Sequence, residues 1–175
     1  NELYQAKDGG GERVWQVALE GTIQAGKGNR GEAVRCFHEV LKIADYVPSM
    51  VKLNAACFYA LYELGKHLCE QQKYEDAAEN FEAALLMAPP ESKQQLKLQC
   101  AWCSWQRRDL EAAEILYIDI LETDSFCWHA LLDRSRMYLD RMQWAEALSD
   151  LEMVIAIGHV SAEIFNDRGV CYFEL

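Results

Sequence analysis

The chain has 175 residues, of which 51% are apolar, so it is long enough to bury a full hydrophobic core and lacks the composition of a disordered protein. Its formal net charge of -11, from 28 acidic and 17 basic side chains, disfavours nucleic acid or an anionic membrane surface as the main partner. Neither a long apolar run nor a secretory signal pattern is visible, so we expect no membrane insertion.

One helical pattern recurs along the chain, in which an alanine is followed four residues later by a large apolar residue. In chain order it occurs in GNRGEAVRCFHEVLKIADYV, KYEDAAENFEAALLMAPP, DLEAAEILYIDILETDSF and QWAEALSDLEMVIAIGHV. In the second copy Tyr74, Ala77, Phe81 and Ala84 are spaced three or four apart, which places them on one face of a helix. The acidic side chains fall mostly on the opposite face, so each copy predicts an amphipathic helix.

The spacing of the four copies and the helix before each copy identify the repeat. The anchoring alanines lie 44, 36 and 34 residues apart, at Ala33, Ala77, Ala113 and Ala147. The last spacing matches the 34-residue helix-turn-helix period of tetratricopeptide repeats, whose first helix has the pattern W-x2-L-G-x2-Y. Leu61, Leu64, Gly65 and Leu68 fill these slots in the second unit. A small residue is needed at Gly65 because the two helices cross closely there.

On these residues the chain resembles the tetratricopeptide repeat family over roughly residues 14–175. The resemblance implies an all-α fold, a right-handed superhelical array of antiparallel helix pairs that forms an alpha-solenoid. We expect a flexible N-terminal segment at 1–13, because three consecutive glycines favour a flexible link. The expected units are about 14–47, 48–91, 92–127 and 128–161, with a half unit at 162–175. The longer second unit predicts a first helix of about twenty residues, with Pro48 in its first turn.

The last segment, AEIFNDRGVCYFEL, repeats the first-helix pattern with Phe165, Gly169 and Tyr172. We expect these three residues to pack back on the fourth unit. Three other apolar side chains should then lie uncovered: Ile164, Cys171 and Leu175. Because an uncovered apolar face tends to find another surface, the segment predicts self-association through the C-terminal helix.

Residues that could carry metal or catalytic chemistry are better explained by structure. Cys100 and Cys103 form one C-x-x-C, but both fall inside a predicted helix without a second pair at zinc spacing, which favours core packing over metal or redox chemistry. The glycine-rich AGKGNRG lacks the residue order of a phosphate loop, and we interpret it as a turn in which Gly28 supplies backbone freedom. We therefore predict no enzymatic activity, no cofactor and no metal site. The seven cysteines indicate reduced thiols and a cytoplasmic location, with the nucleus as the alternative.

A helical array offers a concave wall that is lined mainly by the first helix of each unit. Aromatic rings bury large areas, and polar side chains beside them can bond a peptide backbone. For Trp102, packing in the core is the alternative interpretation. The expected partner-binding residues of this wall are Tyr59, Tyr62, Lys66, Gln95, Gln99, Trp102, His129, Asp133, Arg136 and Asn166.

One known groove of the family is a carboxylate clamp, which holds the acidic C-terminal tail of heat-shock chaperones with Lys, Asn and Arg side chains. The clamp is missing, because the corresponding positions carry Ala18, Thr22, Glu63, Gln95 and Gln99. A register shifted by one unit fits no better. Acidic side chains along the expected wall favour a neutral or basic partner. They are Glu63, Glu70, Asp133 and Asp140.

The sequence therefore predicts a non-catalytic protein-protein interaction scaffold that binds a peptide or helical segment of a partner protein in its concave groove. Two alternatives stay open. The array could be a structural spacer or assembly segment of a larger multi-subunit complex, with contacts made through its ends, or a targeting domain of a longer protein. The identity of the partner is not encoded in a recognisable motif, because one fold class serves many functions.

Overall fold

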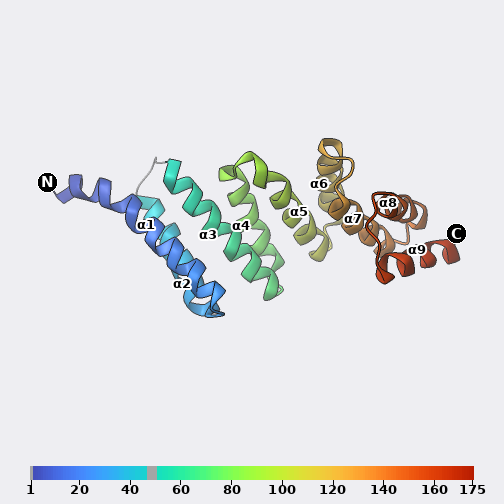
Figure 1. Cartoon of the computed structure of the whole chain (residues 1–175), viewed down its shortest axis with the longest axis horizontal. Helices are drawn as coiled ribbons and strands as arrows, with labels where there is room; N and C mark the ends of the chain where they lie inside the picture. The colour runs from blue at the N-terminus through green and yellow to red at the C-terminus, as the bar shows by residue number, and fades with distance from the viewer. Residues whose placement is uncertain (1, 47–50) are drawn as a thin grey trace. The chain divides into compact units, whose positions relative to one another are not determined.

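The structure is a computed structural model that describes the backbone of residues 2–46 and 51–175, and the side chains of residues 12–43 and 55–175. Within these ranges the chain forms helices and no strand, which confirms the predicted all-α fold (Figure 1). The helices are α1 (Glu2–Gly26), α2 (Arg30–Tyr46), α3 (Val51–Glu70), α4 (Tyr74–Met87), α5 (Pro90–Gln106), α6 (Leu110–Thr123), α7 (Trp128–Asp140), α8 (Trp144–Ala156) and α9 (Ala162–Glu174). Among these helices, none is long and apolar enough to cross a membrane.

Neighbouring helices form the expected pairs. Helix α1 packs on α2, α3 on α4, and α7 on α8, while α2 also contacts α3 and α8 contacts α9. Figure 1 shows α1 beside α2 and α3 beside α4, each pair joined by a turn. Packing between one pair and the next is what a helical repeat array requires, because each unit buries its apolar face against its neighbours.

The turn inside each pair has the same backbone conformation although the sequence differs. One residue of each turn lies in the left-handed region, at Gly28 (φ 79°), Gln72 (φ 60°), Arg108 (φ 66°) and Met142 (φ 57°). Only the first is a glycine, the residue that adopts this conformation without a steric penalty. The recurrence shows that one turn geometry closes all four pairs.

Close helix crossings occur at Gly65, as predicted, and at Gly21 in the first pair. A Cβ atom added at Gly21 would lie 2.7 Å from the ring of Phe37, and one added at Gly65 would lie 2.6 Å from the ring of Phe81. In both pairs the contact joins the first helix to its own second helix. In these two pairs the close approach of the ring explains why a small residue is needed on the first helix.

The chain divides into two compact parts, which we call the N-terminal body (Asn1–Leu96) and the C-terminal body (Lys97–Leu175). Each has its own hydrophobic core. The core of the N-terminal body contains Val14, Ala18, Ala33, Phe37, Val40, Ala56, Cys57, Ala60 and Leu64. The core of the C-terminal body includes Ala101, Ala113, Tyr117, Ile120, Ala130, Leu131, Ala147, Leu151 and Val154.

The N-terminal elements differ in detail from those expected. Helix α1 begins at Glu2 and runs through the glycines at 9–11, where we expected a break. A helical backbone can continue through glycine because its hydrogen bonds do not involve the side chain, at a cost of about 1 kcal/mol per residue. The flexibility of 1–13 in solution stays a prediction. Helix α3 has 20 residues, the length expected, and Pro48 lies outside the described residues.

The packing face expected for the last helix is wrong. Ile164 and Cys171, expected to be uncovered, are buried in the core of the C-terminal body with exposed fractions of 4% and 0%. Phe165 and Tyr172, expected to pack on the fourth unit, are 45% and 56% exposed, and a Cβ atom at Gly169 would meet nothing within 4 Å. In the first two units, Gly21 and Gly65 pack against the second helix of their own unit rather than against the preceding unit. Gly169 has the corresponding position in α9, so its face is not the one that packs on the fourth unit. Leu175 is exposed, as expected.

Candidate partner-binding surfaces

The ten predicted partner-binding residues lie on first helices, and none is buried in a core. The structure describes them as two sets. Those of the N-terminal body are Tyr59, Tyr62, Lys66 and Gln95. Those of the C-terminal body are Gln99, Trp102, His129, Asp133, Arg136 and Asn166. Packing in the core was the alternative interpretation for Trp102, but its side chain is only half-buried.

In the N-terminal body, Tyr62 and Lys66 form one surface because they lie one turn apart on α3. The Lys66 ammonium lies 5.4 Å from the centroid of the Tyr62 ring, and the ring also packs 6.0 Å from that of Phe81. Lys66 donates hydrogen bonds to both oxygens of Glu63, at 3.1 and 3.3 Å. Partial burial lowers the pKa of Lys66, but the hydrogen bond and charge of Glu63 outweigh it, so the pKa is raised overall. The side chain therefore stays charged at neutral pH.

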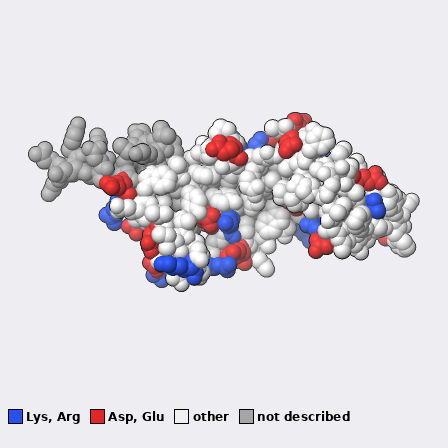
Figure 2. Space-filling model, in the orientation of Figure 1, with Lys and Arg blue, Asp and Glu red and all other residues white. Residues whose placement is uncertain are grey.

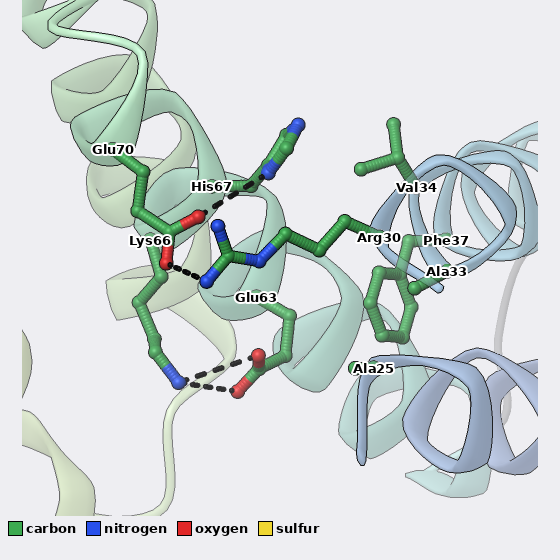
Figure 3. Close-up of a pocket in the computed structure, with 9 residues that line it drawn as sticks. All are labelled: Ala25, Arg30, Ala33, Val34, Phe37, Glu63, Lys66, His67 and Glu70. Atoms are coloured by element: carbon green, nitrogen blue, oxygen red, sulfur yellow. Dashed lines mark hydrogen bonds and ion pairs between the residues drawn. The ribbon is translucent and has the colours of Figure 1, made fainter. Parts of the chain in front are cut away.

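Lys66 also borders a cavity of about 230 Å³ between α2 and α3 (Figure 3). Phe37 and Ala33, both buried, form an apolar floor, and charged side chains of α3 surround the opening. Proteins bind small molecules in pockets of about 300–1,000 Å³, so this one has the size for a single side chain rather than a cofactor. The cavity is lined by Ala25, Arg30, Ala33, Val34, Phe37, Glu63, Lys66, His67 and Glu70.

The charges around this cavity are paired. Arg30 reaches from α2 to Glu70 on α3 with an N–O distance of 3.2 Å, and His67 Nδ1 lies 3.6 Å from the same carboxylate (Figure 3). On the face drawn in Figure 2, acidic and basic side chains are interspersed over this part of the N-terminal body. A ligand here would meet polar groups of both signs above an apolar floor, which suits a peptide side chain and its neighbouring amides.

In the C-terminal body, His129, Asp133 and Arg136 lie on one face of α7. Arg136 is engaged by α9: its guanidinium donates to Glu163 at 3.0 Å and lies 3.9 Å from Asp167. Asp133 lies three residues before Arg136 on the same helix and is half-buried. Burial raises the pKa of Asp133 to about 6, while the charge of Arg136 acts in the opposite direction.

Tyr117, on α6, is a residue that the sequence analysis did not single out. Its side chain is completely buried, and its hydroxyl has no hydrogen-bond partner in the described part of the chain. Burial raises its pKa, and the charges of Asp133 and Cys103 raise it further. Tyr117 occupies the aromatic position of the third alanine-aromatic copy, where the second copy has Phe81. The hydroxyl group, which Tyr117 has and Phe81 lacks, is the feature of the sequence that could have singled out this position.

His129 lies in a stack of aromatic rings. The ring of Trp128 lies 3.6 Å from that of His129 and 4.2 Å from that of His159, between ring centroids. Burial lowers the pKa of His129, and the proximity of His159 lowers it further. His129 is therefore neutral at neutral pH and adds no charge beside Asp133.

The lining of the cavity was also missed, since Arg30, Phe37 and Glu70 were not among the predicted binding residues. Glu70 was noted only for its charge, and Arg30 only as part of a glycine-rich turn.

In the ranges whose side chains are described, no three His, Cys, Asp or Glu side chains are grouped to hold a metal ion. Cys100 and Cys103 are both buried within α5.

Comparison with known proteins identifies the fold. The solved structure of MamA aligns with a TM-score of 0.77 at 18% identity, over 94% of this chain and 83% of MamA. BtubC (BKLC) from P. vanneervenii aligns with a TM-score of 0.71 at 19% identity, over 98% of this chain and 76% of that protein. The TPR domain of P58(IPK) aligns with a TM-score of 0.61 at 17% identity, over 92% of this chain and 46% of that one. Identities this low show the fold alone.

Sequence comparison gives the family. No curated protein matches the chain significantly. A family model described as tetratricopeptide repeat matches residues 19–92 and again residues 62–125, which together make up more than half of the chain. With its helix pairs, its recurring turn and its small residue at each close crossing, the chain belongs to the tetratricopeptide repeat family.

Proposed function

We propose that the chain is a non-catalytic scaffold that binds a peptide or helical segment of a partner protein along the groove-lining side of its first helices. Tetratricopeptide repeat proteins generally mediate protein-protein interactions. The observation that carries the proposal is the surface of α3, where Tyr62 and Lys66 lie on the solvent side and Lys66 borders a cavity with room for one side chain.

The surface of α3 has the composition of a binding site. The Tyr62 ring is half-buried and held by Phe58 and Phe81, with centroid distances of 6.3 and 6.0 Å, so it loses little freedom when it contacts a ligand. Tyrosine is enriched where binding energy concentrates. The apolar floor of the cavity would receive a side chain, while Glu63 and Glu70 offer acceptors to its neighbouring amides.

Charge favours a neutral or basic partner. The chain carries a net charge of -11, and both described surfaces contain carboxylates, Glu63 and Glu70 on α3 and Asp133 on α7. An acidic segment would be repelled by this field, whereas a basic one would be attracted and guided to the surface.

Selection from a random peptide display library tests the proposal. We expect the chain to enrich a family of neutral or basic peptides, and Tyr62→Ala or Lys66→Ala to weaken those bound by the N-terminal body. Leu86→Ala is the matched control, because Leu86 on α4 is an apolar residue that is 88% exposed and lies outside the proposed surface. A library that enriches no peptide, or peptides that bind all variants equally, would contradict the proposal.

A second candidate function is assembly, which the face of α9 supports. Phe165 and Tyr172 are exposed on either side of the open position at Gly169, so two α9 helices from two copies of the chain could pair antiparallel. Phe165 of one copy would then meet Tyr172 of the other, and the glycine would permit a close crossing. We propose self-association of the chain through this face, with a second copy as the occupant.

A further inference from the structure

A second cavity, of about 450 Å³, adjoins the first one in the N-terminal body. It is bounded by α2, α3 and the beginning of α4, and two residues, Val34 of α2 and His67 of α3, line both cavities. Both are drawn at the upper edge of the first cavity in Figure 3. Two cavities that share a wall can receive two neighbouring side chains of one bound segment.

The ring of His67 forms part of the wall between the two cavities and is positioned by a contact on each side. Its Nδ1 atom lies 3.6 Å from Glu70, which lines the first cavity. Its Nε2 atom lies 2.8 Å from Nε2 of Gln71, which lines the second. Arg30 holds Glu70 in turn, with an N–O distance of 3.2 Å. Because the ring is held on both sides, the two cavities are distinct.

The second cavity combines an apolar floor with an acidic rim. Leu64 is buried and Leu68 is half-buried, so the floor is apolar. The exposed carboxylates of Asp76 and Glu79 on α4 line the rim together with the ammonium of Lys73. Asp76 and Glu79 are three residues apart and therefore lie on one face of the helix, where like charges repel each other. A cation bound between them would offset this repulsion.

A long basic side chain matches both parts of the second cavity. Lysine and arginine pack their aliphatic stems on apolar surface while their charged heads stay at a polar edge. Such a stem would lie on Leu64 and Leu68, and its head would donate to Asp76 and Glu79. An acidic side chain would be repelled. In the first cavity the charges around the opening are paired and the floor is Phe37, so an apolar side chain fits there.

We propose that the two cavities bind one partner segment, with an apolar side chain in the first cavity and a neighbouring lysine or arginine in the second. The proposal deepens the proposed function and rests on it. It extends the binding surface of α3 onto α2 and α4, and it assigns the preference for basic partners to the rim formed by Asp76 and Glu79.

Short peptides with one apolar and one basic residue test the paired cavities. The probes are nine-residue peptides of Ala, Ser and Gly that carry one Leu and one Lys, either adjacent or separated by one, two or three residues. They are titrated into the isotopically labelled chain and followed by NMR. For the spacing that binds best, replacement of Leu by Ala should weaken binding at least about tenfold, because it removes the buried side chain. Replacement of Lys by norleucine should weaken it about three- to tenfold, as expected for ion pairs at an exposed rim. If no spacing binds, the proposal is wrong.

Two double variants assign the preference for lysine to the acidic rim. Asp76→Asn with Glu79→Gln keeps the size of both side chains and should abolish the preference for Lys over norleucine, while Asp76→Asn alone should reduce it in part. Glu82→Gln with Glu91→Gln is the matched control, because it also removes two exposed carboxylates of the N-terminal body, and neither residue lines the second cavity. If both double variants keep the full preference, or both lose it equally, the rim does not bind the lysine.

The NMR signals of the chain locate the bound peptide without any variant. The amide signals of Val34 and His67, which line both cavities, should shift when the best probe is added. The probe with Ala in place of Leu should no longer shift the signal of Phe37, and the probe with norleucine in place of Lys should no longer shift that of Glu79. Shifts that leave Val34 and His67 unchanged would overturn the proposal.

The outcomes separate the paired cavities from the proposed function. If library peptides bind through Tyr62 and Lys66 but the probes with Lys and norleucine bind alike, the paired cavities fail and the scaffold function stands. If the library enriches no peptide while the probes bind through Asp76 and Glu79, the scaffold proposal fails in its present form and the paired cavities stand.

Discussion

Gly65 of α3 lies against the aromatic ring of Phe81 on α4, so closely that a Cβ atom at Gly65 would be 2.6 Å from Cε1 of the ring. The same relationship joins Gly21 and Phe37 in the first pair, at 2.7 Å. These contacts set the distance between the two helices of each pair. The helix pair in turn fixes which side of α3, with Tyr62 and Lys66, remains available to a partner.

Replacement of Gly65 by alanine should destabilise the chain. The added methyl group would have to displace the Phe81 ring, which is fully buried, and overpacking of this kind costs about 1–3 kcal/mol. Gly169→Ala is the control, because a Cβ atom there meets nothing, so the better helix propensity of alanine should leave stability unchanged or raise it by up to about 1 kcal/mol. Denaturant unfolding of both variants checks this. Equal effects would contradict the packing.

The ion pair between Arg134 and Asp150 should contribute to the stability of the C-terminal body. Arg134 donates two hydrogen bonds to the carboxylate, at 2.8 and 2.7 Å, and Asp150 is buried. The hydrogen bond to Asp150 raises the pKa of Arg134. We expect Asp150→Ala to lower the free energy of unfolding by about 2–4 kcal/mol, since it leaves the guanidinium without its partner. Glu32→Ala, which breaks the exposed pair with Arg35, should cost less than about 0.5 kcal/mol.

Asp133→Asn should stabilise the folded chain at neutral pH. Burial raises the pKa of Asp133 from 3.8 to about 6, so the folded state favours the protonated form, and the stability that this form contributes is lost as the pH rises through about 6. The neutral asparagine avoids that loss. We expect a gain of about 1–3 kcal/mol near pH 7.5 that shrinks as the pH falls toward about 5. Thermal unfolding at the two pH values measures it, and a gain independent of pH would contradict the assignment.

Self-association should depend on the exposed face of α9. Sedimentation velocity of the chain should show a concentration-dependent dimer that is lost when Phe165 and Tyr172 are both changed to alanine. Phe173→Ala is the matched control, because Phe173 is 85% exposed on the same helix but lies outside the proposed contact. A chain that is monomeric at all concentrations, or a dimer that Phe173→Ala disrupts equally, would contradict the proposal.

The repeating pattern of the sequence predicted the helix pairs because it fixes local geometry. An alanine followed by an aromatic residue, with a small residue on the helix before it, can be satisfied only by a close pair, and Gly65 and Phe81 meet as expected. The pattern does not show which neighbouring helix a residue of the last unit packs against, because the pattern there covers only one helix. For that reason Phe165 and Tyr172 were assigned to the wrong face, while Ile164 and Cys171 make the core contacts.

The candidate sites could be predicted only in part. Helical periodicity placed Tyr62, Lys66 and Asp133 outside the core, as the structure has them. It could not show that Arg30 reaches Glu70 across forty residues of sequence, or that the Tyr117 hydroxyl is buried without a hydrogen-bond partner among the described residues. Such features depend on how successive helix pairs pack together, which the sequence of a single pair does not show.

Calorimetric titration of the library-selected peptides into the chain and its variants is the most direct test of the scaffold function. We expect Tyr62→Ala to weaken peptides bound by the N-terminal body, and Trp102→Ala those bound by the C-terminal body, by about 1–4 kcal/mol each, as central aromatic anchors do. Circular dichroism and thermal unfolding must first show that both variants are folded. If both are folded and bind every selected peptide as tightly as the unmodified chain, the first helices do not form the binding surface and the central claim is contradicted.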